Sequence, residues 1–354
     1  MSLAAPPREP AAWAAELGVS VEAVELLLDS DFVDLHLDLD VPVRVVRYDA
    51  AKRHRTPGRP PPLWGHTDLP RLIESGFTGV VYDIATNPAR PPRNRLRATA
   101  RNLRRIQAMV ARHADALALV TTRSGYDQAR ADGKLALWLS LQGGNAIIHD
   151  LGVLDGPIGQ LLHRITLVHL TSSRLGGTSS PAGLDRGLGP KDAELIERCN
   201  HQRVFVDLAH AGKKTFWDAL KVHRAGVPPI VSHTGVDGVR KHWRNLDDDQ
   251  IRAIVDRGGV VGIMYQSNFL SPVWLYAKRS AIVDHLEHVI NVAGEDAAAI
   301  GTDYDGAIVP PIDLPDPTHH PKLVQDMLDR RWSEERIRKV LGGNYLRVVK
   351  EMRA

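Results

Sequence analysis

The stretch RVFVDLAHAGKKTFWDALKVHRAGVPPIVSH, residues 203–233, contains the pattern that decides the fold. It opens with a short apolar run at Arg203–Leu208, continues with an amphipathic segment at Lys213–Arg224, and closes with a second apolar run at Pro229–Ser232. Short runs that are hydrophobic at nearly every position indicate strands buried on both faces. A strand, a helix and a second strand in this order predict a parallel βαβ unit.

The same alternation extends in both directions along the chain. The apolar runs that predict strands are Phe32–Leu37, Thr78–Ile84, Leu135–Leu141, Arg164–Leu170, Arg203–Leu208, Pro229–Ser232, Gly259–Met264 and Ala298–Gly301. The amphipathic segments that predict helices between them are Leu96–Arg112, Lys191–Cys199, Lys213–Arg224, Asp247–Arg257 and Ser280–Val292. This pattern predicts an α/β fold, a closed (β/α)8 TIM barrel. We expect a single domain over residues 1–354, in which residues 1–30 form a helical extension.

Charge and composition exclude several classes of protein. The 354 residues include 45 Lys and Arg and 42 Asp and Glu, and a net charge of +3 is too small for a nucleic-acid-binding protein. No run reaches about 18 apolar residues, and residues 1–10 do not resemble a signal peptide, so no membrane partner is expected. The single cysteine, Cys199, excludes an internal disulfide and favours a cytoplasmic location. A metal ion would therefore be held by histidines and carboxylates.

Polar side chains follow the predicted strands at their carboxyl ends. They are His36 and Asp38, Gln142, His169, Asp207 and His210, His233, and Asp303. In a barrel of this type the carboxyl ends of all strands open on one face, where active sites lie. A mixed shell of imidazoles and carboxylates with an open position suits the activation of water by a metal ion. The sequence therefore predicts a metal-dependent site at this mouth.

Each of these residues also has a structural interpretation when it is taken alone. His36 and Asp38 lie on the same side of a strand, where they can share a metal ion or form an ordinary polar pair. His210 and His233 each fit a hydrogen-bonded structural histidine at a strand end. Asp303 fits a turn, because glycines flank it at short distance. The metal interpretation depends on all five residues meeting at one place.

Two further interpretations follow from the remaining motifs. Arg244 fits a solvated basic patch around Lys241, and it also fits a guanidinium that receives a substrate carboxylate. The serines at 172, 173, 179 and 180 do not form a GxSxG motif, so a serine hydrolase is not expected.

Several ordered motifs together resemble the membrane (renal) dipeptidase family, zinc-dependent barrel enzymes of the amidohydrolase superfamily. The resemblance extends from about Asp31 to Arg347. The segments that carry it are Asp34–Asp38 (DLHLD), Val206–His210 (VDLAH), Val231–Thr234 (VSHT), Arg244–Leu246 (RNL) with Asp248, Gly301–Gly306 (GTDYDG) and Gly343–Arg347 (GNYLR). The order of these motifs is far more specific than any one of them. The resemblance implies hydrolysis of dipeptides or dipeptide-like amides by a metal-activated water.

The resemblance also implies a set of metal ligands. By this resemblance His36 and Asp38 would bind one zinc ion, and His210 and His233 would bind a second one. A glutamate bridges the two ions in the family, and the matching position here is Gln142. A neutral amide adds no negative charge and bridges two ions poorly. We therefore predict one tightly held metal ion and a weak or empty second position.

Substrate contacts follow from the same resemblance. His169 would polarise the scissile carbonyl, Arg244 would hold the carboxylate of the C-terminal residue, and Asp303 would transfer the proton. Asp303 could instead be a ligand of the single ion, in a shell with His36, Asp38 and His210. A dipeptide-like small molecule is the expected partner, and a homodimer is an open possibility.

Because of Gln142, two other functions stay open beside dipeptide hydrolysis. The first is a catalytically weak or inactive homologue that binds a peptide-like ligand. The second is a hydrolase or tailoring enzyme that acts on a different small molecule.

Overall fold

The structure is a computed structural model that describes residues 3, 8–85, 90–170, 176–181 and 183–354. Ser172 and Ser173 lie outside the described residues. Nine strands form among the described residues: β1 Val33–Leu37, β2 Gly79–Ala85, β3 Leu117–Leu119, β4 Leu135–Gln142, β5 Leu162–Thr166, β6 Phe205–Asp207, β7 Val231–Thr234, β8 Val261–Ile263 and β9 Ala298–Ile300. Each of the eight predicted runs therefore overlaps one of these strands.

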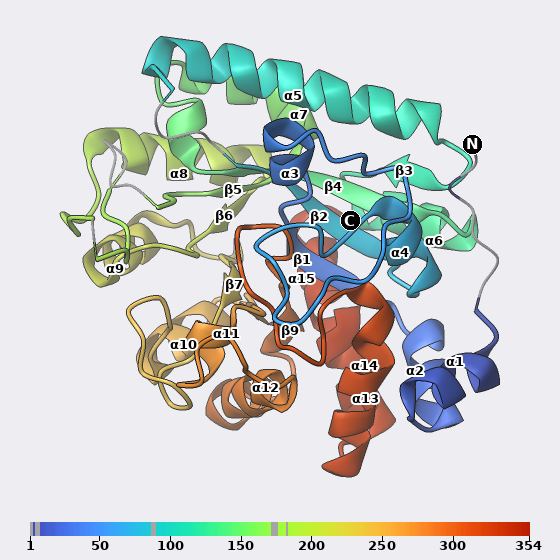
Figure 1. Cartoon of the computed structure of the whole chain (residues 1–354). Helices are drawn as coiled ribbons and strands as arrows, with labels where there is room; N and C mark the ends of the chain where they lie inside the picture. Colours follow the sequence, from blue (N-terminus) through green and yellow to red (C-terminus); the bar gives the residue numbers. More distant parts are fainter. Residues whose placement is uncertain (1–2, 4–7, 86–89, 171–175, 182) are drawn as a thin grey trace.

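The strands close into a barrel. One set of strands pairs in the order β1-β2-β4-β5-β6 and another in the order β7-β8-β9, and every pair is parallel. A parallel bridge between Asp207 and Ile230 joins β6 to the start of β7. A second parallel bridge, between Leu37 and Tyr304, joins β1 to the segment after β9. The predicted (β/α)8 barrel is thereby confirmed, and Figure 1 shows the strands at its centre.

Several predicted strand boundaries differ from the observed ones, and β7 begins and ends two residues later than the predicted run Pro229–Ser232. β5 ends at Thr166, whereas the predicted run continued to Leu170, so His169 lies in the loop that follows the strand. The apolar run is longer than the strand because Leu167 and Val168 remain buried after the strand has ended. β3 was not predicted, because three residues are too few to show a period. It pairs with the first half of β4, outside the barrel order.

Helices surround the barrel in Figure 1. They are α1 Pro10–Leu17, α2 Val21–Asp29, α3 Asp40–Val45, α4 Leu69–Glu74, α5 Pro92–Arg112, α6 Arg123–Ala131, α7 Pro157–Leu161, α8 Pro190–Gln202, α9 Lys213–Val222, α10 Asp248–Val255, α11 Ser267–Leu270, α12 Ser280–Ala293, α13 His320–Asp329, α14 Glu334–Arg338 and α15 Asn344–Met352. The five predicted helices correspond to α5, α8, α9, α10 and α12. At the start of α10, Asp247 caps the Gln250 N–H at 2.9 Å, as the cluster of aspartates at 247–249 predicts.

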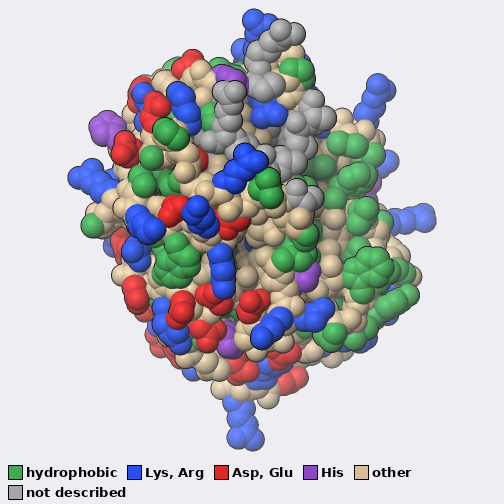
Figure 2. Space-filling view, turned by 90° about the vertical axis from the view of Figure 1, so that its left-hand side faces the viewer, with side chains coloured by type: hydrophobic (Ala, Val, Ile, Leu, Met, Phe, Trp, Pro, Cys, Tyr) green, Lys and Arg blue, Asp and Glu red, His purple; other side chains and the backbone are tan. Residues whose placement is uncertain are grey.

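The outer surface carries charges of both signs. Figure 2 shows Lys and Arg side chains interspersed with Asp and Glu over the left-hand and lower parts of one face. Among the described residues, no helix is both long enough and apolar enough to cross a membrane. The longest helix, α5, has 21 residues and is rich in arginine. At the other end of the chain, α15 packs beneath the barrel, where the Tyr345 hydroxyl lies 2.8 Å from His163 Nε2.

Candidate active site

The eight predicted site residues converge at one end of the barrel. A cavity of about 390 Å³ opens there. The predicted residues that line it are Asp38, Gln142, His169, His210, Arg244 and Asp303. His36 and His233 have no exposed surface. They lie beneath the residues that line the cavity and contact Gln142 and His210 among them. The residues are brought together because each lies in or directly after the carboxyl end of a parallel strand.

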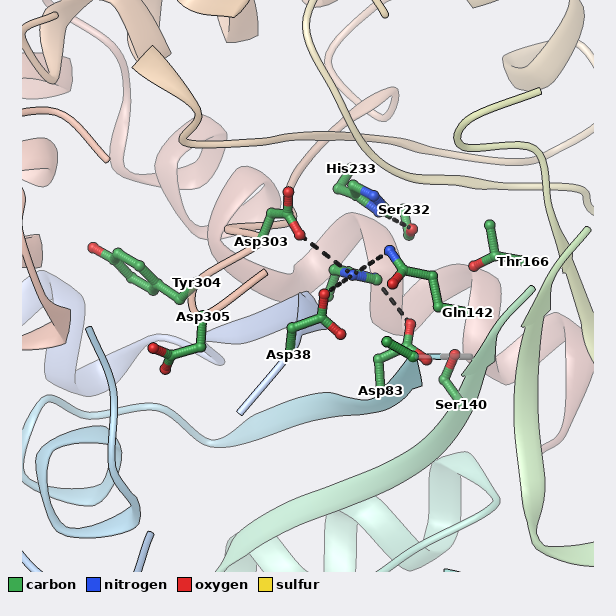
Figure 3. Close-up of polar contacts among 12 residues, drawn as sticks. Asp38, Asp83, Ser140, Gln142, Thr166, Ser232, His233, Asp303, Tyr304 and Asp305 are labelled. Atoms are coloured by element: carbon green, nitrogen blue, oxygen red, sulfur yellow. Dashed lines mark hydrogen bonds and ion pairs between the residues drawn. The ribbon is translucent and has the colours of Figure 1, made fainter. Parts of the chain in front are cut away.

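His36 is at the centre of the polar contacts. Its Nε2 lies 3.5 Å from Asp38 Oδ2, 3.5 Å from Asp303 Oδ1 and 3.1 Å from Gln142 Nε2. Its other nitrogen, Nδ1, lies 3.0 Å from Asp83 Oδ2. The dashed lines that converge in Figure 3 mark these contacts. The imidazole therefore presents Nε2 to the cavity side and Nδ1 to the barrel interior.

A buried ion pair lies directly behind His36. The Arg164 guanidinium bonds to Asp83, and its Nη2 also lies 2.8 Å from His36 Nδ1. Arg164 Nε donates to Ser140 Oγ at 2.8 Å, and Nη1 donates to the carbonyl of Leu35. When Nδ1–H donates to Asp83, the lone pair of Nε2 is free to bind a metal ion, and the carboxylate strengthens that ligand. Arg164 reduces this effect, because it already neutralises Asp83.

His233 is oriented by a second chain of hydrogen bonds. Asp207 accepts from the Ser232 hydroxyl at 2.6 Å and from the Ser232 N–H at 2.9 Å. The same hydroxyl oxygen lies 2.8 Å from His233 Nδ1. Since the hydroxyl proton is directed to Asp207, Nδ1–H donates to the oxygen and leaves Nε2 unprotonated. His233 Nε2 in turn lies 2.8 Å from His210 Nε2.

Three potential metal ligands lie near enough to one another to hold a single ion. One ligand atom each from His36, His233 and Asp303 lies within 4.8 Å of the other two. The rings of His36 and His233 are stacked, with centroids 3.7 Å apart. The shell predicted from the sequence contained His210 and left His233 outside it, which differs from this grouping. His233 lies nearer to His36 than His210 does, because β7 points its side chain inward next to β1. His210 instead follows β6 and has a left-handed backbone conformation, with φ at 65°.

The electrostatics of this group suit a cation. Burial keeps the pKa of His233 and of His210 well below the ordinary value, so both are neutral, as ligands must be. Burial also lowers the pKa of His36, but the Asp83 and Asp38 carboxylates outweigh it and raise the value to about 10. A proton is thus attracted to the point where a metal ion would sit. The donors present, two or more imidazoles with carboxylates, fit one divalent ion.

Asp303 is held in an unusual backbone conformation. Its φ is 61°, in the left-handed region that side chains rarely adopt. Asp305, two residues on, anchors the loop by accepting from the backbone N–H groups of Gly65, His66 and Thr67. A Cβ at Gly306 would collide with the Asp303 carboxylate and approach Asp38 Oδ2 to 2.9 Å, so a larger residue there would displace these carboxylates. Burial raises the pKa of Asp303 above its ordinary value.

Arg244 is not part of a solvated basic patch. Only 3% of it is exposed, and its Nη2 donates to the carbonyl of His233 at 2.7 Å. Burial lowers its pKa to about 10, although Asp303 and Asp207 partly offset this effect. Its Nε has no hydrogen-bond partner among the described residues. A desolvated guanidinium that borders a cavity is suited to bind an anion.

His169 borders the same cavity and is half-buried. Burial lowers its pKa to about 4, so the imidazole is neutral and can donate a hydrogen bond to a carbonyl oxygen. Its ring packs edge-on against His210, with centroids 4.8 Å apart.

Sequence reasoning missed the residues behind the ligands. Asp83 and Arg164 were assigned only to apolar strands, and Ser232 only to the end of the apolar run Pro229–Ser232. A signal was present, because a charged residue in the middle of a buried strand is rare and usually paired. Arg164 and Asp83 both have no exposed surface.

A family model described as membrane dipeptidase (peptidase family M19) matches residues 21–354. The chain belongs to the membrane dipeptidase family. Membership makes the chain a metallo-dipeptidase or amidohydrolase by type, and the family implies a divalent metal ion. The resemblance predicted from the motifs is confirmed.

Solved structures support the fold of this dipeptidase-family chain. A probable dipeptidase, PvdM from Pseudomonas aeruginosa, has a TM-score of 0.81 at 18% identity, covering 97% of this chain and 99% of that one. The dipeptidase AC, a metallo peptidase, has a TM-score of 0.79 at 24% identity, covering 91% and 98%. A metallo peptidase from Rhodobacter sphaeroides, liganded with a phosphinate mimic of L-Ala-D-Ala, has a TM-score of 0.78 at 23% identity, covering 92% and 100%.

Proposed function

We propose that this chain hydrolyses dipeptides or dipeptide-like amides with one tightly held divalent metal ion, which we expect to be zinc. The observation that carries the proposal is the buried group His36, His233 and Asp303, which lies beneath a cavity bordered by Arg244. A bound ion would lower the pKa of water from about 15.7 towards about 7, which supplies a nucleophile at neutral pH.

The charges around His36 favour one ion over two. Gln142 lies 3.1 Å from His36 Nε2 and 3.5 Å from His210 Nε2, between the two halves of the ligand set, and it is neutral. On the opposite side of His36, Arg164 neutralises Asp83, whose carboxylate lies 3.0 Å from Nδ1, so this pair adds no net charge. Relative to a site bridged by glutamate, the missing negative charge therefore disfavours a second divalent ion. We therefore propose His36, His233, Asp303 and Asp38 as the ligands, with His210 beside them.

The other side chains would bind and orient the substrate. Arg244 would receive the carboxylate of the C-terminal residue, because its buried guanidinium borders the cavity and its Nε has no hydrogen-bond partner among the described residues. Neutral His169 would donate a hydrogen bond to the scissile carbonyl oxygen. Asp303 would bind the ion through one carboxylate oxygen, and its other oxygen would accept a proton from the attacking water and pass it to the leaving amine.

A binding protein without turnover is the second candidate. Gln142 favours it, because loss of a bridging carboxylate is also a route to an inactive homologue. In either case we propose that residues 1–354 form one domain, with α1 and α2 as a helical extension. A cytoplasmic location and a homodimer stay predictions.

One experiment separates these candidates. Metal content per chain is measured by mass spectrometry, and the same sample is assayed on dipeptides with L- and D-residues at the C-terminus. One ion per chain with turnover supports the proposal. Two ions with turnover support a binuclear dipeptidase, and no ion with no turnover supports the binding protein.

A further inference from the structure

The cavity has an apolar wall beside Arg244. Trp243 precedes Arg244 in the chain, and both residues line the cavity together with Met264 and Phe269. The Trp243 and Phe269 rings pack edge to face, with centroids 5.6 Å apart. The carbon that bears the substrate's side chain is bonded directly to the carboxylate carbon. A substrate whose carboxylate is bound to Arg244 therefore has the side chain of its C-terminal residue beside this wall.

The wall and the guanidinium form one rigid unit. Asn245 Nδ2 donates to the carbonyl of Phe269 at 2.9 Å and to the carbonyl of Arg240 at 2.7 Å. The Thr234 hydroxyl donates to the carbonyl of Arg244 at 3.1 Å. These bonds tie the loop that carries Trp243 to β7 on one side and to α11 on the other. The distance between the anion-binding group and the apolar wall is fixed as a result.

Apolar side chains around the mouth are exposed to an unusual degree. Val45 is 61% exposed, Leu170 50% and Trp243 42%, and all three line the cavity. In Figure 2, apolar side chains gather on the right-hand edge of the face, which is the side nearest the viewer in Figure 1. Large apolar side chains exposed together around a pocket usually mark a surface that a ligand covers.

Charged substrate side chains would find little to pair with in this cavity. Among the described lining residues, the carboxylates are Asp38 and Asp303, which belong to the proposed metal group. The arginine other than Arg244 is Arg44, which is held by Asp40 at 2.5 Å and by the carbonyl of Ala85 at 3.0 Å. A charged side chain would lose water without gaining a partner, whereas an apolar one gains by burial.

We infer that Trp243, Phe269 and Met264 determine specificity, and that they select dipeptides whose C-terminal residue carries a large apolar side chain. The inference rests on the proposed function, because it takes Arg244 as the site of the carboxylate. The selectivity between leucine and aspartate at this position is expected to be about 10- to 100-fold in kcat/KM, from the burial of one apolar side chain.

The test compares variants of the whole chain on Ala-Gly, Ala-Leu, Ala-Phe, Ala-Asp and Ala-Lys. Trp243→Ala is expected to lower kcat/KM for Ala-Leu and Ala-Phe about 10-fold and to change Ala-Gly less than about 3-fold. Trp217→Ala is the matched control, because Trp217 is a half-exposed tryptophan on α9 outside the cavity lining. Phe269→Ala is a second variant of the same wall. A substitution that disturbed Arg244 would instead lower kcat/KM for all five substrates together.

Equilibrium binding separates this inference from the proposed function. Phosphinate analogues of Ala-Gly, Ala-Leu and Ala-Asp are titrated by calorimetry into the metal-loaded wild type and Trp243→Ala. A preference for the leucine analogue that Trp243→Ala abolishes supports the inference, even if no dipeptide is hydrolysed. Hydrolysis of all five dipeptides at similar rates, with equal binding of the analogues, would overturn the inference and leave the hydrolase proposal intact.

Discussion

Replacing Gln142 with glutamate tests whether the missing carboxylate sets the metal content. Gln142 lies at the end of β4, is 1% exposed and is within 3.5 Å of both His36 Nε2 and His210 Nε2. Glutamate has almost the same shape, so Gln142→Glu adds one negative charge with little change in packing. We expect the variant to bind a second ion and to gain dipeptide hydrolysis.

The size of the effect follows from the charges. Two unit charges about 4 Å apart interact by about 4 kcal/mol at an effective dielectric constant of about 20, so two divalent ions at that distance repel by roughly 16 kcal/mol. A carboxylate with an oxygen about 2 Å from each ion offsets much of this repulsion. Dehydration of the carboxylate reduces the gain. We expect the second ion to bind about 100-fold more tightly, or about 2.7 kcal/mol.

The assay is metal stoichiometry by mass spectrometry with calorimetric titration of zinc, run beside dipeptide hydrolysis. Gln160→Glu, at an exposed position on α7, is the control for the added charge. The reasoning is refuted if the wild type already holds two ions at full occupancy and hydrolyses dipeptides rapidly. It is also refuted if Gln142→Glu folds normally and still binds a single ion.

Three further predictions concern the substrate, the ligands and the stability of the fold. Arg244→Ala is expected to weaken the binding of inhibitors with a free carboxylate by about 2–4 kcal/mol, and the binding of carboxamide-capped inhibitors much less. Equal losses of binding for both kinds of inhibitor would contradict the proposed contact between Arg244 and the carboxylate. His233→Ala and His210→Ala should each lower metal content or activity, the first more strongly, while circular dichroism shows a folded protein; unfolding with normal metal binding would mean that both are structural. Burial raises the pKa of Asp192 to about 7, so the folded protein keeps a proton that the unfolded chain loses above about pH 4, and the free energy of unfolding falls as pH rises between these values. Asp192→Asn, which retains an acceptor for the Gly189 N–H, should abolish this fall, and Tm measured at pH 5 and pH 8 checks it.

The sequence by itself determined the barrel and most of the site. Strand and helix periods are local properties, so the eight runs and five helices could be recognised without knowing what packs against them. The site residues could be placed because parallel strands in a barrel all end on one face, so His36 and Asp303 meet although they are 267 positions apart in the chain.

Only the tertiary structure decided how these residues are held and which of them lie closest. Asp83 and Arg164 are 81 positions apart, and nothing local to either strand shows that they pair behind His36. The same holds for the burial of Arg244, which follows the basic segment Arg240–His242, and for the approach of His233 to His36 across the barrel. The reason is physical: a local pattern fixes which way a side chain points, but the partner that compensates a buried charge comes from another strand, and that partner is chosen only when the barrel closes.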